Sequence, residues 1–230
     1  MKTRFVCLAN SFKEGGRCPA GMELDEQNNP ILMNGYPKWV RPICKTEHEE
    51  VPTNLVSHIT VLDIVEIDVT SIPEKLGYQS ENVYFDVNNI KVSEKFDCNR
   101  LSELCCNRKY ILGNKGKAVS KDYIKKMDFS LMLIKTNKFE VIEKSYDDNP
   151  NKPQYRLVFE HNNYKYDLPI TDPVFLHKYP KDHSLLEDYK DIFISLSLGV
   201  KWNDWYYKLV AAIICGNKKE DIDLIDDLPF

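Results

Sequence analysis

The sequence predicts a mainly β protein with minor α, in which two small barrels are followed by a short acidic tail. Three observations predict this architecture. The chain of 230 residues contains 13 Tyr, 10 Phe and 3 Trp, and aromatic side chains favour strands over helices. About ten short runs have the β-branched and aromatic content of strands. They form two groups of roughly five, separated near residues 95–110, and about five strands are enough to close a small barrel.

The first group of predicted strands begins with the apolar run 4–9 and ends with 83–87. Residues 59–69 form the clearest strand between them, because β-branched side chains dominate that run. Residues 39–44 form a shorter strand that contains Pro42. Proline cannot donate to a ladder, so we expect this strand to lie at an edge or to be bulged.

Between the two groups the pattern changes from strand to helix. Residues 101–105 fit one helical turn, and Ser120 can cap a second short helix that ends at Lys126. In the second half, Asp172 followed by Pro173 predicts a third helix start. The remaining predicted strands are 129–135, 139–143, 155–160, 164–168, 192–198 and 206–214.

These elements divide the chain into four parts. We expect residues 1–97 to form the first barrel and residues 128–216 to form the second. A basic helical connector, residues 98–127, joins them, and residues 217–230 form an acidic docking tail.

Composition excludes several classes of protein. Apolar residues make up 43% of the chain and charged residues 29%, which is too apolar for a disordered protein. No run approaches the roughly 18–20 apolar residues that cross a bilayer. The apolar run near the start is too short for a signal peptide, so we expect a cytoplasmic protein that contacts no membrane.

Cysteines and histidines follow no pattern typical of catalysis or metal binding. The seven cysteines are irregularly spaced and include no C-x-x-C, so we expect reduced thiols and no structural zinc. The five histidines stand apart, and no H-E-x-x-H, G-x-S-x-G or P-loop pattern is present. We therefore expect no catalytic residue, no metal and no cofactor, and we interpret the chain as a binding protein rather than an enzyme.

The acidic excess of the chain lies at its C-terminal end. The formal net charge is −4, yet residues 220–230 include five acids and no base, which leaves 31 basic and 30 acidic residues for the body. The last five residues, Asp226-Asp227-Leu228-Pro229-Phe230, resemble the tip of bacterial single-stranded-DNA-binding proteins. In that family the tip recruits helicases, nucleases, recombination mediators and replication factors.

The chemistry of this tip fits docking into a partner's pocket. Phe230 supplies an apolar anchor, and its α-carboxylate can pair with an arginine of the partner. Pro229 limits the entropy lost on docking, and Asp226 and Asp227 steer the tip toward a basic rim. The alternative is an acidic solubilising end. The segment between barrel and tip is shorter than the linker usual in that family, so the tip is expected to have a restricted reach.

Several segments of the body also form a recognisable set. They are Cys7-Leu8-Ala9-Asn10-Ser11, Trp39-Val40-Arg41-Pro42, Tyr110-Ile111-Leu112-Gly113-Asn114, Tyr166-Asp167-Leu168-Pro169 and Tyr207-Lys208-Leu209-Val210-Ala211. Together they span most of the body and resemble a bacterial family described as a dual OB-fold domain. The resemblance implies two small OB-like barrels and the binding of nucleic acid or nucleotide, without a known chemistry.

Residues 108–126 are the densest basic cluster of the body. Seven basic residues and one acid lie there, with tyrosines between them. Basic groups beside aromatic rings are what sequence-tolerant single-strand binding requires. The alternative is a solvated helix face on a connector. The candidate nucleic-acid-binding residues of this cluster are Arg108, Lys109, Tyr110, Lys115 and Lys117.

A second cluster combines the turn after the first strand with the strand that contains Pro42. Lys13 and Arg17 flank a Gly-Gly turn whose N–H groups can face a phosphate, although a plain hairpin turn is an equal alternative. Trp39 and Arg41 alternate along one strand face, so we expect a patch that combines stacking and charge.

The third cluster is the aromatic run at residues 202–207. Trp202, Trp205 and Tyr206 are candidates for stacking on bases. Alternatively, these rings fill the end of the barrel core.

Three functions remain open. The first, which we favour, is a non-enzymatic adaptor that binds single-stranded nucleic acid and recruits DNA repair or replication proteins through its tip. The second is a decoy that occupies the tail pocket of host proteins without binding DNA, and the near-neutral body favours it. The third is a nucleotide-sensing module of a phage-defence system, with its ligand beside Arg17 and Arg41.

Overall fold

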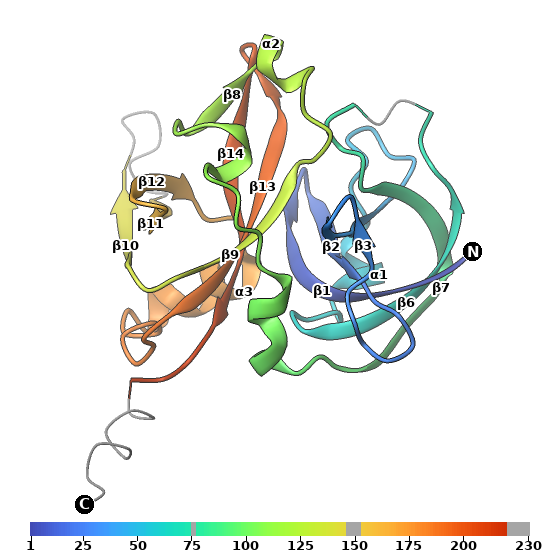
Figure 1. Ribbon diagram of the computed structural model, residues 1–230, viewed down its shortest axis with the longest axis horizontal. Helices are drawn as coiled ribbons and strands as arrows, with labels where there is room; N and C mark the ends of the chain where they lie inside the picture. Colours follow the sequence, from blue (N-terminus) through green and yellow to red (C-terminus); the bar gives the residue numbers. More distant parts are fainter. Residues whose placement is uncertain (75–76, 146–152, 220–230) are drawn as a thin grey trace, which may run out of the picture.

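The computed structural model shows two β-rich units that lie side by side (Figure 1). The structure describes residues 1–74, 77–145 and 153–219. One unit is formed by the N-terminal strands and the other by the C-terminal strands. The prediction of a mainly β protein with two barrel-like units is confirmed.

The first unit is built from short and long strands and one helical turn. Its elements are β1 (Lys2–Lys13), β2 (Gly16–Glu23), β3 (Leu32–Met33), β4 (Tyr36–Pro37), β5 (Trp39–Ile43), α1 (Thr53–Val56), β6 (Asp63–Ser71) and β7 (Asn82–Lys95). The barrel is closed, with the strand order β1-β2-β5-β7-β6. Neighbouring strands are antiparallel except β5 and β7, which are parallel.

β1 closes the barrel because it bends and pairs with strands on both sides. Its register against β2 shifts between Cys7 and Ala9, and such a bulge bends the strand that contains it. β2 approaches β1 very closely at one position: a Cβ on Gly21 would lie 1.8 Å from the carbonyl oxygen of Val6. Any residue larger than glycine would push these two strands apart.

The two halves of β5 pair with different strands, which accommodates the proline in its second half. Trp39 and Val40 pair with β2, whereas Arg41, Pro42 and Ile43 pair with β7. Pro42 lies where β5 no longer pairs with β2, so its missing N–H breaks no ladder bond to that strand. β5 is not an edge strand, because it lies between β2 and β7 in the closed barrel, but the half that contains Pro42 pairs with β7 alone.

The predicted strand 59–69 begins only at Asp63. The N–H and hydroxyl of Thr60 donate to the Asp63 carboxylate at 2.7 and 3.0 Å, and Leu62 has a φ of 70°. This turn keeps the chain out of the extended conformation, so the β-branched residues before it do not lengthen the strand.

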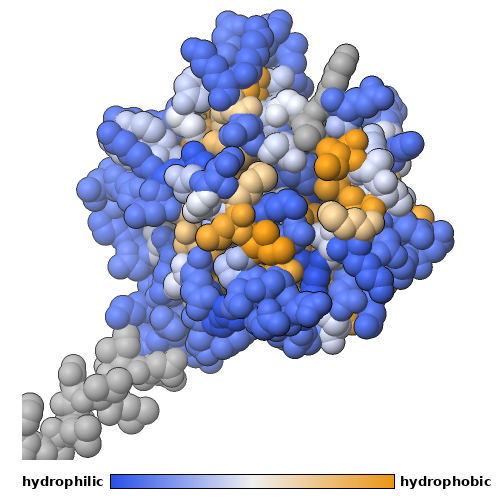
Figure 2. All heavy atoms as spheres, turned by 45° about the vertical axis from the view of Figure 1, so that its right-hand side comes forward, coloured by the Kyte–Doolittle hydropathy of each residue, from blue (hydrophilic) through white to orange (hydrophobic). Residues whose placement is uncertain are grey.

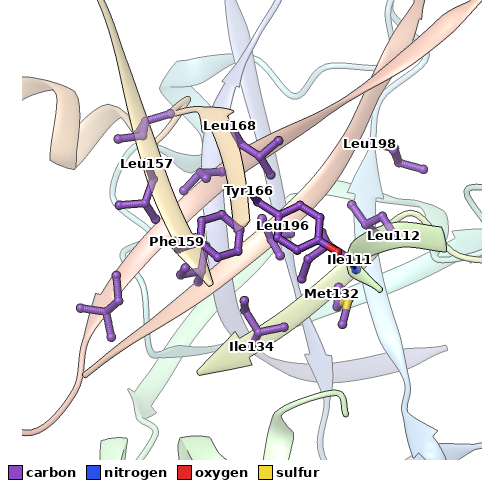
Figure 3. Packing of buried hydrophobic residues seen from close by; sticks show 14 of the residues in the cluster. Ile111, Leu112, Met132, Ile134, Leu157, Phe159, Tyr166, Leu168, Leu196 and Leu198 are labelled. Atoms are coloured by element: carbon purple, nitrogen blue, oxygen red, sulfur yellow. Dashed lines mark hydrogen bonds between the residues drawn. The ribbon is translucent and has the colours of Figure 1, made fainter. Parts of the chain in front are cut away.

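The second unit consists of two sheets curled around one core. Its elements are β8 (Ala118–Ser120), β9 (Leu131–Thr136), β10 (Phe139–Lys144), β11 (Gln154–His161), β12 (Tyr164–Pro169), α3 (Pro173–Lys178), η3 (Tyr179–Lys181), β13 (Ile192–Trp202) and β14 (Trp205–Cys215). The sheets have the orders β10-β11-β12 and β8-β14-β13-β9. Leu157, Phe159 and Leu196 pack in the core between them (Figure 3). The hydroxyl of Tyr166 accepts a hydrogen bond from the Ile111 N–H at 3.2 Å, which satisfies the polar atom of this core ring.

The segment expected to be a helical connector contains η1 (Cys98–Leu104), η2 (Ile111–Gly113), β8 and α2 (Lys121–Ile124). Asp97 caps η1 by accepting from the Asn99 N–H at 3.0 Å. Ser120 caps α2 by accepting from the Tyr123 N–H at 3.3 Å, as predicted. Since β8 pairs with β14, part of this segment belongs to the sheet of the second unit.

The two units share a buried interface. Leu8 of β1 packs in one apolar cluster with Phe193 of β13. The buried hydroxyl of Ser195 donates to the Leu8 carbonyl at 2.6 Å, and the Phe12 N–H donates to the Thr171 carbonyl at 3.1 Å. Apolar packing and hydrogen bonds therefore fix one unit against the other.

The face shown in Figure 2 is mainly hydrophilic, with apolar side chains gathered in patches near its middle. Leu32, Met33 and Tyr36 are among the exposed apolar side chains of the first unit. Within the described ranges, no helix has the length and apolar composition needed to cross a bilayer.

Candidate nucleic-acid interface

A basic groove of about 710 Å³ lies on the second unit, and its volume is in the usual range of ligand sites. Its walls come from the residues before β8, from β10, β11 and β12, and from Tyr207 of β14. The charged residues that line it are Lys115, Lys117, Lys144, Arg156, Lys165 and Asp167.

Four cations of this basic groove divide into two groups, and the fifth, Lys115, lies over the Tyr164 ring, 4.3 Å from its centre. Lys144 and Arg156 both contact the carboxylate of Asp167 at 2.5 Å. Burial would raise the pKa of Asp167, but hydrogen bonds from these two cations lower it. Lys117 and Lys165 are exposed, and neither makes an ion pair with any residue that the structure describes. These two lysines are therefore available to a phosphate backbone.

Three exposed aromatic side chains continue the groove along the β13–β14 hairpin. Trp202 and Trp205 are direct cross-strand partners, so they share one face. Tyr207 lies two residues along β14 and points to that same face. Their exposed fractions are 53%, 46% and 37%. Because Tyr207 also lines the basic groove, this aromatic face and the groove form one surface.

The tip of the hairpin is a tight two-residue turn. Asn203 and Asp204 have φ values of 47° and 63°, which is the backbone that a twisted two-residue hairpin requires and that these residue types tolerate. Lys201 and Lys121 contact the Asp204 carboxylate at 2.9 and 3.6 Å. Figure 1 shows this tip beside α2 at one end of the molecule. The two tryptophans thus project from a well-defined turn.

Lys208 of β14 supports the segment that contains Lys115 and Lys117. Its side chain is fully buried, and its Nζ donates to the carbonyls of Ile111 and Asn114, both at 2.6 Å. Burial lowers the pKa of Lys208 to about 7. The Lys208 N–H also donates to the Lys117 carbonyl at 2.9 Å, so the turn before β8 is held on β14.

The structure brings several predicted residues to this surface. Lys115, Lys117, Trp202 and Trp205 lie on it. Tyr110 adjoins it, because the Lys115 Nζ lies 5.9 Å from the centre of the Tyr110 ring. The exposed Lys109 lies next in the chain, with its Nζ 5.3 Å from that ring.

Two predicted residues lie elsewhere. Tyr206 points to the opposite face of the hairpin, where its ring packs edge-on against Tyr78 at 5.0 Å. The guanidinium of Arg108 lies between the rings of Tyr36 and Phe129, 4.3 Å from the centre of each. Its stacking joins the first unit to the second, so the structure places this candidate nucleic-acid-binding residue between the two units and not in the basic groove.

The expected surface patch of Trp39 and Arg41 does not form. Arg41 is 2% exposed; it contacts Glu81 at 2.9 Å and donates to the Ser130 hydroxyl at 2.8 Å. Burial would lower the pKa of Arg41, but the Glu81 carboxylate raises it. Trp39 is half-buried against the cluster that both units share. The patch is absent because the second unit covers this part of β5.

Lys13 and Arg17 lie at the end of the β1–β2 hairpin, apart from the basic groove. Lys13 lines a small cavity of about 160 Å³ between the units, together with Arg41. Arg17 lines a different cleft, of about 400 Å³. The structure therefore separates Arg17 from Arg41, which the nucleotide-sensing hypothesis placed together.

Sequence reasoning missed four residues of the surface. Lys144, Arg156 and Lys165 stand alone in their strands, and only the pairing of β10, β11 and β12 brings them together. Tyr207 could have been found, because strand alternation places it on the face of Trp205. The docking tip, Asp226 to Phe230, lies outside the described residues. Among the residues within them, no group of three or more His, Cys, Asp or Glu side chains is placed to hold a metal.

The fold and the site define a class of protein: two joined β-barrel units, one of which has a basic groove lined with aromatic rings. The chain belongs to the dual OB-containing domain family, whose model matches residues 3–213. A comparison with curated proteins found no match. Since OB folds are recurrent scaffolds for oligonucleotide binding, membership of this family indicates nucleic-acid or oligonucleotide binding in general.

Proposed function

We propose that the protein is a non-enzymatic adaptor whose second unit binds single-stranded nucleic acid. Phosphates contact the free lysines of the basic groove, and bases stack on the aromatic face. The observation that supports this proposal is the continuity of the two surfaces through Tyr207. A groove of positive charge beside exposed rings is the combination that single-strand-binding proteins use.

The aromatic face favours a single strand over a duplex. Base faces are accessible to Trp202 and Trp205 only when they are not covered by neighbouring bases, as in an unpaired strand. Stacking is tolerant of sequence because every base has a π face. We therefore expect weak sequence preference and much lower affinity for a duplex.

The charge of the groove limits how strongly the strand binds. Lys117 and Lys165 are free, whereas Lys144 and Arg156 already contact Asp167. Outside the acidic segment 220–230 the body has nearly balanced charge, so long-range attraction is weak. Affinity should therefore depend on local contacts and fall as salt concentration rises.

The test is the affinity for single-stranded and duplex oligonucleotides, measured by anisotropy and by quenching of tryptophan fluorescence. The double variant Lys117→Glu and Lys165→Glu reverses two groove charges that make no ion pair with a described residue, and it should abolish binding. The matched control is Lys2→Glu, an equal charge change per site on the exposed start of β1. Unchanged affinity in the double variant would rule out the basic groove as the binding site.

For the C-terminal tip, we propose recruitment of DNA repair or replication proteins. The support is the sequence Asp226-Asp227-Leu228-Pro229-Phe230, which combines an acidic approach with an apolar anchor. Removal of Leu228 to Phe230 should abolish recovery of helicases or nucleases while oligonucleotide affinity stays the same. Loss of partners from a protein that binds no oligonucleotide in either form would instead favour a decoy.

A further inference from the structure

A second cleft lies where the two units meet, and it shares no lining residue with the basic groove. Its volume is about 400 Å³, which suits a small ligand. The β1–β2 hairpin forms one wall, the loop after α1 forms another, and α3 with the residue before it forms the third. We call it the inter-unit cleft.

Arg17 is the cation of the first-unit wall. Its guanidinium stacks on Phe12, 4.4 Å from the ring centre, and makes one long hydrogen bond, of 3.5 Å, to the Asn10 carbonyl. Its Nε is buried without a hydrogen-bond partner among the described residues. Burial lowers the pKa of Arg17, although the nearby carboxylate of Asp172 opposes this shift. The guanidinium is thus held by stacking and has spare donors.

The carboxylate of Asp172, which lines the inter-unit cleft, accepts hydrogen bonds from the backbone. Its oxygens accept from the N–H groups of Val174, Phe175 and Ile213 at 2.9, 3.2 and 3.1 Å. Burial raises the pKa of Asp172, although these hydrogen bonds oppose the rise. Asp172 interacts electrostatically with Arg17. The two groups make no direct ion pair in the part of the chain that the structure describes, so the Arg17 guanidinium keeps donors for a second anion.

Further cations lie across the cleft on α3. Lys178 lines it and is exposed, and it makes no ion pair with a described residue. His177 also lines it; its Nε2 lies 2.8 Å from the Nζ of Lys181. Because an ammonium group only donates, this imidazole nitrogen is the acceptor of the contact. One lysine of the second unit, Lys178, therefore lines the same cleft as the arginine of the first.

The cleft also presents exposed apolar surface next to these cations. Phe12 is 53% exposed and Val174 is 51% exposed, and both line it. A flat ring can stack against Phe12 or against the guanidinium that Phe12 supports. Cations beside a stacking surface match a ligand that has both an anionic group and an aromatic ring.

The walls of the inter-unit cleft are fixed before any ligand enters. The Phe12 N–H donates to the Thr171 carbonyl across the interface. The Asn10 side chain donates to the carbonyls of Val56 and Ile59 at 2.8 and 3.0 Å, which ties β1 to the loop after α1. A preformed site costs little ordering entropy on binding.

We infer that the inter-unit cleft binds a nucleoside phosphate, with the phosphate between Arg17 and Lys178 and the base against Phe12. Arginine suits this role because its planar group donates to phosphate oxygens and stacks on rings. The ligand is either a free nucleotide or the phosphorylated end of a strand, since both present the same groups. This site is separate from the basic groove and does not depend on strand binding there.

The test is calorimetric titration of the full chain with AMP, GMP, ADP, adenosine and inorganic phosphate. We expect the nucleoside phosphates to bind more tightly than adenosine or phosphate alone. Arg17→Gln should weaken nucleotide binding about tenfold or more, the loss expected for a charge-assisted hydrogen bond. Lys178→Gln, an exposed substitution that leaves the fold intact, should weaken it less.

Variants of the basic groove separate this proposal from the proposed function. Lys117→Gln should leave AMP affinity unchanged, and Arg17→Gln should leave the affinity for an unphosphorylated oligonucleotide unchanged. If Lys117→Gln weakens AMP binding and Arg17→Gln and Lys178→Gln do not, the nucleotide binds in the groove and the inference is wrong. Absence of heat and of thermal stabilisation with every nucleotide at millimolar concentration would overturn it as well. A competition experiment identifies the source of the ligand. If a 5′-phosphorylated oligonucleotide displaces AMP and the unphosphorylated strand does not, the cleft accepts the phosphorylated end of a strand.

Discussion

Arg41 in the first unit and Lys117 in the second are both cations beside a β-barrel, yet their surroundings are opposite. Arg41 is buried at the interface and contacts Glu81 and Ser130. Lys117 is exposed at the rim of the basic groove and has no ion-pair partner among the described residues. The first barrel is closed, whereas the second unit consists of two separate sheets.

This difference shows how two units of similar type can have different roles. In the closed barrel the strand edges are paired, and its buried cation contacts a neighbouring carboxylate, so we expect that unit to act as a support. In the second unit the two sheets leave a groove between their strands, and lysines line it. The exposed aromatic face lies on this unit as well. We therefore expect substitutions in the first unit to change stability and substitutions in the second to change binding.

The largest effect should come from the buried ion pair. Arg41→Met leaves the carboxylate of Glu81 buried without its cation, so the free energy of unfolding should fall by about 3–5 kcal/mol. Urea unfolding followed by fluorescence measures this loss. The double variant Arg41→Met and Glu81→Leu should recover much of it. Weaker oligonucleotide binding in Arg41→Met without lost stability would contradict a supporting role for the first unit.

The next effect concerns the aromatic face. Trp205→Ala should weaken single-strand binding by about 1–3 kcal/mol, the usual contribution of one stacked base. Its unfolding free energy should change by less than about 0.5 kcal/mol, because the ring is exposed. Tyr206→Phe is the control, since Tyr206 points away from that face. Equal losses of binding in both variants would show that the strand does not follow the predicted face.

A third prediction uses the buried lysine of the second unit. The folded Lys208 loses its proton near pH 7, whereas in the unfolded chain a lysine has a pKa of about 10.4. At a pH between these two pKa values, Lys208 takes up a proton when the protein unfolds. Raising the pH therefore makes unfolding less favourable. The stability of the protein relative to Lys208→Met should increase by about 1 kcal/mol per pH unit from pH 7 to 9. Urea unfolding across this range tests the sign, and a flat difference would mean that Lys208 stays charged.

The smallest effect concerns one phosphate contact. Lys117→Gln should reduce the slope of log affinity against log salt concentration by about 1. Lys2→Gln on the first unit should leave that slope unchanged. Identical slopes in the two variants would indicate that Lys117 meets no phosphate.

Much of the fold was predictable because the signals were local. β-branched runs predict most strands, and immediate neighbours predict the Ser120 cap and the helix start at Asp172 and Pro173. The start of β6 was misplaced, because the turn at Leu62 depends on a side-chain contact with Asp63 that composition does not reveal.

The candidate site was predictable only where its residues are close in sequence. Lys115 and Lys117 belong to one basic run. Lys165 was missed because strand pairing alone brings it to them. Arg41 was misjudged for the same reason: its partners Glu81 and Ser130 come from distant parts of the chain.

The apolar cluster shared by the units also has a consequence for biosynthesis. Phe193 and Ile214 pack in one cluster with Val6 and Leu8, although β13 and β14 are translated long after β1. The N-terminal half therefore emerges with apolar side chains exposed to solvent. They become buried only after β13 and β14 have been synthesised. A chain interrupted before residue 192 is expected to aggregate rather than fold as a free-standing module.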